Sequence, residues 1–326
     1  MLGFIVRRIL TSFVVLAAAS FLLYMIVTSF GDPLAELRNR NPPVAAQVIE
    51  DRRAELNLDK SPLERYGIWA GGVVQGDFGE NLAGEEISPL LVRRLQVTMR
   101  MVLLATLVAV ALAVAVGVYS AVRQYTAGDY AATFFGFLFL STPVFWLAEL
   151  LKEFLAIRLN RVLGGTYVYT VGAQSPNLTG SLWERVLDYA GHLALPTLSL
   201  ALISFAAWSR FQRAAMLDVL NSDYLRLARA KGLSSTRVLL KHGLRNALIP
   251  LTTVVAIDFA AVLGGAIVIE SVFAWQGMGR LLLDAIDRYD PNVVAAWLLV
   301  SGAVVILFNL VADILYGILD PRIRLG

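Results

Sequence analysis

The sequence predicts an all-α integral membrane protein with six transmembrane helices. Hydrophobic residues make up 57% of the 326 residues and charged residues only 16%, whereas about a quarter of a typical soluble domain is charged. The mean hydropathy is +0.66. The apolar residues also fall into blocks of about 20, which is the helix length needed to cross a hydrocarbon core about 30 Å thick.

The first apolar block follows the basic pair Arg7 and Arg8 and covers residues 9–30. A secretory signal peptide has a shorter apolar region that ends at a small-residue cleavage site. Here the small residues Ala17 to Ala19 lie in the middle of the block. We therefore predict that residues 1–30 form an uncleaved first transmembrane helix whose N-terminus is cytoplasmic.

The remaining blocks complete a set of six spans. Their predicted limits are 9–30, 98–121, 129–151, 190–211, 248–273 and 292–318. The third span is crowded at its end by Glu149, Lys152 and Glu153. Pro196 is expected in the first turn of the fourth span, where a proline is tolerated because that N–H has no helical partner.

Two long polar segments interrupt the spans. Residues 31–96 are predicted to form an extracytoplasmic insertion with a helical stretch at 45–56 and a glycine-rich run from Gly71 to Gly79. That run lacks a following Lys-Ser/Thr, so we interpret it as turn geometry rather than a phosphate cradle. Residues 152–189 form the second polar segment.

Basic residues on short loops set the orientation, since cytoplasmic loops carry the excess of Lys and Arg. The turn after the second span carries Arg123, and the tail at 321–326 carries Arg322 and Arg324. The loop at 213–247 carries only two acidic residues against seven bases: Arg213, Arg226, Arg229, Lys231, Arg237, Lys241 and Arg245. Both termini and this loop are therefore predicted to be cytoplasmic, with 97–320 as a core of five spans.

The loop at 213–247 is the candidate functional element. Residues 224–231 are predicted to form a short helix in which Leu225 and Ala228 share one face and Leu227 and Ala230 share another. Gly232 is placed to end it, and a second helix is expected from Ser235 to Leu248. One interpretation is a basic surface on anionic lipid headgroups; the other is a rigid helix–glycine–helix element that docks on a soluble motor subunit.

The same loop resembles the coupling loop of binding-protein-dependent ABC importer permeases, whose pattern is Glu-Ala-Ala, three residues, Gly, then Ile-x-Leu-Pro. Ala228 and Gly232 match the second alanine and the glycine, whereas Arg226 stands in place of the Glu and Leu244-Arg245 in place of Leu-Pro. With these departures, the loop resembles the B-type permease subunits of the oligopeptide/dipeptide branch of the family. The two motifs of that branch correspond to residues 226–233 and 242–250 of this chain.

Three further stretches resemble the same branch. They are Leu58–Leu63 with Tyr66 and Gly76–Gly79; Gly264-Gly265 with Glu270–Phe273 and Gly277–Gly279, where Gln276 replaces a proline; and Asp313 and Tyr316 with Asp320-Pro321-Arg322. The resemblance covers nearly the whole chain. It implies the ABC type I importer permease fold in a bacterial cytoplasmic (inner) membrane.

The resemblance also implies a set of partners and a site. The partners are a second homologous permease subunit, two ABC ATPase subunits, an extracytoplasmic peptide-binding protein and membrane lipid, with no nucleic acid. The residues implied to couple transport to the ATPase are Tyr224, Arg226, Ala228, Arg229, Ala230, Lys231, Gly232 and Leu233. Peptide is the expected substrate, with nickel complexes or glutathione as alternatives.

Catalytic chemistry of its own is not expected of this chain. It has no phosphate-binding loop, nucleophile elbow or H-E-x-x-H motif. No cysteine and only two histidines are present, which argues against a metal site, and no cofactor is predicted.

Asp258 lies inside the fifth span and could line the translocation path, or pair with a polar neighbour in the companion permease, because charges at membrane depth usually face a cavity or a partner. A proton-coupled secondary transporter, with Asp258 titrating, stays open as an alternative.

Overall fold

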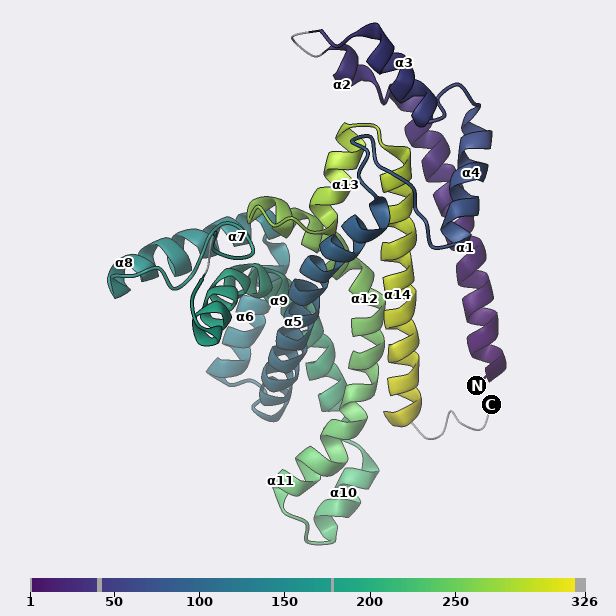
Figure 1. The fold of residues 1–326 in the computed structure, drawn as a ribbon. Coiled ribbons are helices and arrows are strands. Elements are labelled where there is room, and N and C mark those ends of the chain that lie inside the picture. The colour runs from purple at the N-terminus through teal and green to yellow at the C-terminus, as the bar shows by residue number, and fades with distance from the viewer. Residues whose placement is uncertain (1, 40–42, 177–178, 320–326) are drawn as a thin grey trace. The chain divides into compact units, whose positions relative to one another are not determined.

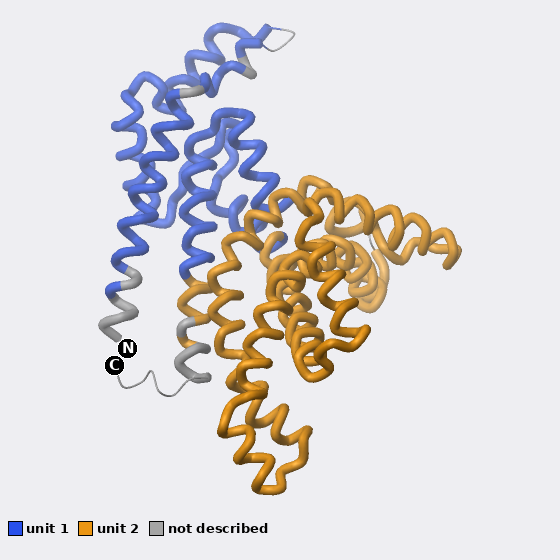
Figure 2. The backbone as a smooth tube through the Cα atoms, turned by 180° about the vertical axis from the view of Figure 1, so that it is seen from behind, with its two compact units in different colours: residues 1–97, 276–306 blue, residues 98–275, 307–326 orange. Residues whose placement is uncertain are grey.

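The computed structural model describes residues 2–39, 43–176 and 179–319, and nearly all regular structure in these ranges is helical (Figure 1). Glu80 and Glu86 form an isolated β-bridge. The chain divides into two compact units, residues 1–97 with 276–306 and residues 98–275 with 307–326 (Figure 2). The predicted tail and the side chains of Asp313 and Tyr316 lie outside the described part.

Five helices in the described ranges are long and apolar enough to cross a membrane, and a bent helix pair provides a sixth candidate. The five lie at Leu10–Ser29 within α1 (Leu2–Phe30), Ile87–Val122 (α5), Leu182–Leu220 (α9), Ser235–Val272, which contains α12 (Arg245–Val272), and Pro291–Ala312 within α14 (Pro291–Leu319). The prediction of an all-α multi-pass membrane protein is therefore confirmed.

The third predicted span is not one straight helix. α6 (Ala127–Ser141) meets the helical stretch Val144–Leu163, which begins with α7 (Val144–Leu151), at an angle of 112°. Pro143 explains the break, because its ring forces the preceding residue out of the helical region, and Thr142 adopts ψ 125°. The helix then continues beyond residue 151, through the π-helix η1 (Lys152–Arg158) and α8 (Leu159–Leu163), so the predicted end of this segment is also wrong.

The fourth span begins eight residues earlier than predicted. Ser181 caps α9 by accepting a hydrogen bond from the Glu184 backbone N–H at 3.4 Å, and the Glu184 carboxylate accepts one from the Ser181 N–H at 2.6 Å. This reciprocal pair is a capping box, a strong helix-start signal. Pro196 consequently lies inside the helix, and the expectation that it occupies the first turn is wrong.

The unit formed by 1–97 and 276–306 contains four shorter helices besides α1 and parts of α5 and α14. They are α2 (Ala35–Arg38), α3 (Ala46–Glu55), α4 (Pro62–Val74) and α13 (Met278–Asp287). α3 matches the helix predicted at 45–56, whereas α13 was not predicted. The core of this unit includes Tyr24, Trp69, Ile87, Leu281 and Val293.

The glycine-rich run is only partly a turn. Gly71 and Gly72 lie within α4, so the turn predicted for them is wrong. Gly76 and Gly79 do adopt positive φ angles of 84° and 76°, a conformation that glycine reaches without a steric cost. A side chain at Gly72 would come within 2.9 Å of the Asp77 carbonyl oxygen, so this glycine lets the following turn approach α4 closely.

The second unit holds the remaining helices and the predicted coupling loop. The first eight residues of that loop extend α9 to Leu220. The rest forms α10 (Asp223–Ala230), α11 (Ser235–Arg237) and the π-helix η2 (Val238–Leu244), which leads into α12. Figure 1 shows α10 and α11 beyond the ends of the neighbouring spans of this unit.

Candidate functional site

The helix–glycine–helix element comprises residues 223–244. α10 ends as predicted: the Gly232 N–H donates to the Arg229 carbonyl at 2.9 Å, and the Leu233 N–H donates to the Ala228 carbonyl at 3.4 Å. Gly232 has a φ angle of 77°. These two hydrogen bonds and the left-handed residue constitute a Schellman motif, which satisfies carbonyls that would otherwise be unpaired. The turn after α10 thus has one defined geometry.

One face of α10 is packed against the chain itself. Leu225 is completely buried, and it forms a small core with Ala228 and Val238, against which Leu233 packs. Full burial of a leucine side chain contributes about 1.5–3 kcal/mol. Ala228 and Leu233, both predicted to couple transport, therefore hold the element in place from within.

The opposite face of α10 carries uncovered apolar side chains. Leu227 is 57% exposed and Tyr224 is 42% exposed, and Ala230 is exposed beside them. The hydroxyl of Tyr224 accepts a hydrogen bond from the Asn246 amide at 2.9 Å, which fixes this ring against the start of α12. Leu227 is the residue that the sequence-based site omitted.

The second helical stretch differs from the α-helix predicted over 235–248. η2 is a π-helix, a wide form that is rare and often found at functional sites. Within it, Gly243 lies close to α9, because a side chain there would come within 3.1 Å of the Met216 methyl group. The wide turn thereby brings its backbone against α9 and ties the element to the end of a spanning helix.

Basic side chains surround the exposed apolar face. Arg226 forms an ion pair with Asp223, and Lys231 is exposed at the end of α10. Arg229 lines a hollow of about 600 Å³ together with Ser235 and Thr236. An apolar centre with a polar, charged rim is a composition found in protein–protein interfaces.

An ion pair with a buried carboxylate joins α6 to α9, the helix that leads into the element. Asp129 at the start of α6 is almost fully buried, and Arg213 of α9 donates to both of its carboxylate oxygens at 2.9 Å. The Tyr125 N–H adds a hydrogen bond at 3.0 Å, and Ser120 donates to the same carboxylate. The two-pronged contact fixes the orientation of both side chains. Sequence reasoning counted Arg213 only as a loop charge and missed Asp129.

Asp258 has a partner within the chain. The buried indole N–H of Trp208 on α9 donates to the Asp258 carboxylate at 2.8 Å. The carboxylate therefore links α9 to α12, 14 residues after the end of the helix–glycine–helix element at Leu244. In the described ranges, no group of three or more His, Asp or Glu side chains is placed to hold a metal ion.

Comparison with known proteins identifies the family. Residues 113–325 match the family model described as the binding-protein-dependent transport system inner membrane component. The chain belongs to this family. It is 42% identical to the oligopeptide transport system permease protein OppB of Mycobacterium tuberculosis, with all of both chains covered.

Other relatives carry related names. The chain is 36% identical to the oligopeptide permease protein AppB of Bacillus subtilis and 35% identical to the glutathione transport system permease protein GsiC of Escherichia coli, covering 99% of this chain and at least 99% of each relative. A solved structure of the MetNI methionine ABC transporter in an inward-facing conformation aligns with a TM-score of 0.53 at 18% identity, over 71% of this chain and 96% of that one. The predicted ABC importer permease fold is thereby confirmed.

Proposed function

We propose that this chain is the permease subunit of an ATP-driven importer of peptides. It forms half of a translocation path with a second, related permease. Two ATPase subunits bind the coupling helices of this pair from the cytoplasm, and residues 223–244 are the docking element of this chain. An extracytoplasmic binding protein delivers the peptide. Family membership and full-length similarity to a mycobacterial oligopeptide permease support this assignment.

The observation that carries the coupling role is the uncovered apolar face of α10 on a rigid support. Leu227 and Tyr224 are exposed, while Leu225 is buried and Gly232 fixes the turn. Isolated exposed apolar residues are ordinary on protein surfaces, but here they lie on an element held by its own core. A load applied to such a face moves the ends of α9 and α12 with it.

The distribution of basic residues indicates the orientation of the chain in the membrane. The basic loop, the N-terminal pair Arg7 and Arg8 and the tail fall on one side under the positive-inside rule. We infer that both termini are cytoplasmic and that the membrane is the inner membrane of a bacterium. ATP hydrolysis belongs to the partner subunits.

Reconstitution tests the proposal. The chain would be co-expressed with a second permease, the ATPases and a binding protein, and uptake of a labelled peptide into proteoliposomes would be measured with and without ATP. Leu227→Asp on α10 is expected to abolish ATP-driven uptake, while the matched control Val48→Asp, at an exposed position on α3, retains it. Peptide uptake by the chain alone under a pH gradient would instead establish a secondary transporter.

A further inference from the structure

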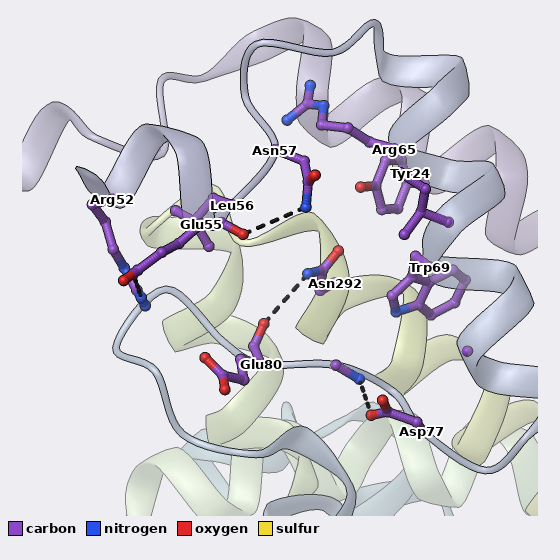
Figure 3. Close-up of a pocket in the computed structure, with 13 residues that line it drawn as sticks. Tyr24, Arg52, Glu55, Leu56, Asn57, Arg65, Trp69, Asp77, Glu80 and Asn292 are labelled. Carbon is purple, nitrogen blue, oxygen red and sulfur yellow. Dashed lines mark hydrogen bonds and ion pairs between the residues drawn. The ribbon is translucent and has the colours of Figure 1, made fainter. Parts of the chain in front are cut away.

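A polar cavity of about 560 Å³ lies within the unit formed by residues 1–97 and 276–306 (Figure 3). Its volume falls within the range of about 300–1,000 Å³ typical of small-ligand sites. α1, α3, α4, the turn at 77–80 and the start of α14 all contribute to its lining.

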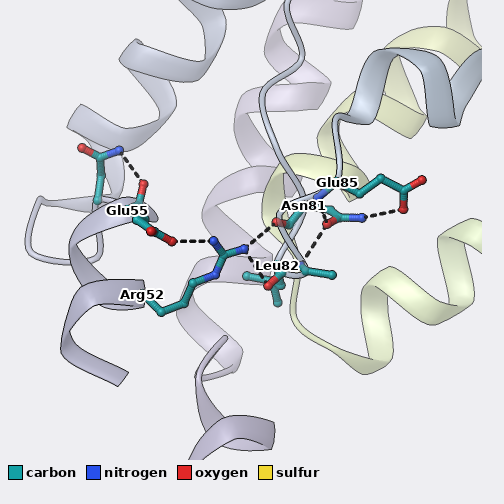
Figure 4. Close-up of polar contacts among 7 residues, drawn as sticks. Arg52, Glu55, Asn81, Leu82 and Glu85 are labelled. Atoms are coloured by element: carbon teal, nitrogen blue, oxygen red, sulfur yellow. Dashed lines mark hydrogen bonds and ion pairs between the residues drawn. The ribbon is translucent and has the colours of Figure 1, made fainter. Parts of the chain in front are cut away.

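The walls of the cavity are fixed by hydrogen bonds. Arg52 of α3 donates to the carbonyl oxygens of Asn81 at 3.2 Å and Leu82 at 2.8 Å and forms an ion pair with Glu55 at 2.6 Å (Figure 4). The Trp69 indole N–H donates to the Phe78 carbonyl at 3.1 Å. These contacts keep α3 and α4 on opposite sides of the turn, so the cavity exists without a ligand.

Arg65 is the cation in this cavity that the fold leaves uncommitted. Its Nε atom is buried and has no hydrogen-bond partner among the described residues. By contrast, the guanidinium of Arg52 is occupied by Glu55 and the two carbonyls. A buried N–H without a partner costs about 1–3 kcal/mol. Because Arg65 also lines the cavity, an anionic group bound there would lie beside this cation.

The opposite side of the cavity carries carboxylates. Figure 3 places Arg65 and Tyr24 at one side, Glu80 and Asp77 at the other, and Trp69 on the wall between them. Asp77 uses one oxygen to accept a hydrogen bond from the Gly79 N–H at 2.7 Å. The Asn292 amide donates to the Glu80 backbone carbonyl at 3.3 Å, which holds the backbone of that residue and leaves its carboxylate at the cavity rim.

We propose that this cavity binds a short peptide with free ends, with its carboxylate at Arg65, its ammonium group at Glu80 and Asp77, and an apolar side chain against the exposed Ile68. The separated charges and this apolar wall specify a zwitterion with an apolar body; the choice of a peptide among zwitterions rests on the proposed function. The site would hold substrate on the permease itself, independently of a binding protein.

The test is equilibrium binding of radiolabelled Ala-Phe-Ala to the purified transporter complex in lipid nanodiscs, without binding protein or ATP. Each end of the peptide is blocked in turn, by N-acetylation or C-amidation. Losing a charge-assisted contact is expected to weaken binding about tenfold or more. Arg65→Gln and Glu80→Gln are expected to do the same, whereas Arg53→Gln and Glu50→Gln, exposed positions of α3 outside the cavity, leave affinity unchanged.

Pairing variants with blocked peptides separates recognition from misfolding. Arg65→Gln should bind the free acid and the amide equally, and Glu80→Gln should bind the free amine and the acetylated peptide equally. Equal binding of blocked and free peptides to the unaltered chain would overturn the proposal, because it would show that the cavity does not recognise the charged ends of the peptide. A cavity that accepts a loop of a partner protein would give that result, since a loop has no free ends. Binding that follows phosphatidylethanolamine content rather than peptide would also overturn it and assign the cavity to a lipid headgroup.

The outcome is distinguishable from failure of the proposed function. If the complete transporter imports the peptide but Arg65→Gln and Glu80→Gln bind it normally, only the cavity assignment fails. If the complete transporter imports no peptide, the proposed function fails.

Discussion

Replacing Gly232 by valine is expected to uncouple transport from ATP hydrolysis without unfolding the protein. Gly232 has a φ angle of 77° in the turn after α10, a region that residues with a side chain rarely adopt. No atom lies within 4 Å of where its side chain would begin. The perturbation therefore acts through the backbone alone.

The magnitude follows from that conformation. A residue with a Cβ atom costs about 1–2 kcal/mol in the left-handed region, which lowers the population of the native turn roughly 5–30-fold relative to competing conformations. A β-branched residue such as valine is a more severe outlier there. Asparagine enters this region several times more readily than other residues, so Gly232→Asn is a control with a side chain of comparable size that keeps the turn.

The assay is ATP-driven peptide uptake by the reconstituted transporter, with ATP hydrolysis measured in parallel. Gly232→Val should lose uptake, and Gly232→Asn should retain most of it. Both variants should appear in the membrane at normal levels, because the packing of Leu225 and Val238 is unchanged. Normal uptake by Gly232→Val would refute the reasoning. Equal loss in both variants would also refute it, since it would show that a small side chain, and not the turn, is required.

Three further outcomes are expected. Arg229→Glu should abolish ATP-driven uptake while membrane insertion stays normal, because it reverses a charge beside the exposed face of α10; normal uptake would exclude a role for this residue. Arg213→Gln should lower the stability of the complex, measured by thermal unfolding, by about 1–3 kcal/mol, since the buried Asp129 loses its cation and keeps only the hydrogen bonds from Ser120 and Tyr125; a smaller loss in the Asp129→Asn/Arg213→Gln double variant is the check. Burial raises the pKa of Asp290, so the stability it contributes is complete below its unfolded pKa of about 3.9 and is lost as pH rises through the folded pKa. The melting temperature of Asp290→Asn relative to the unaltered chain should therefore increase with pH above about 4; a pH-independent difference would contradict this.

Hydropathy predicted the spanning helices because membrane thickness constrains their length directly. The last span was predicted at 292–318 and α14 covers Pro291–Leu319. Errors arose where local signals outweighed the hydropathy window. Pro143 breaks the third span, and the Ser181 capping box starts the fourth span early enough to leave Pro196 inside it. Both signals are visible in the sequence.

The helix–glycine–helix element was predicted in position, but the directions in which its faces point were not. Leu225 and Ala228, or Leu227 and Ala230, satisfy the same three-residue spacing on a helix. Only packing against Val238, the first residue of the π-helix η2, decides that Leu225 and Ala228 face inward. The Asp129–Arg213 ion pair joins positions 84 residues apart, and nothing in the local sequence marks such a pairing.

Cysteine cross-linking tests the central claim most directly, because the chain has no cysteine of its own. Leu227→Cys would place one thiol on the exposed face of α10, and Leu225→Cys would place one on its buried face. In the assembled complex, a short bifunctional reagent is predicted to join the ATPase to the chain through position 227 and not through position 225. No cross-link from position 227, in a complex from which the ATPase is recovered, would contradict the account.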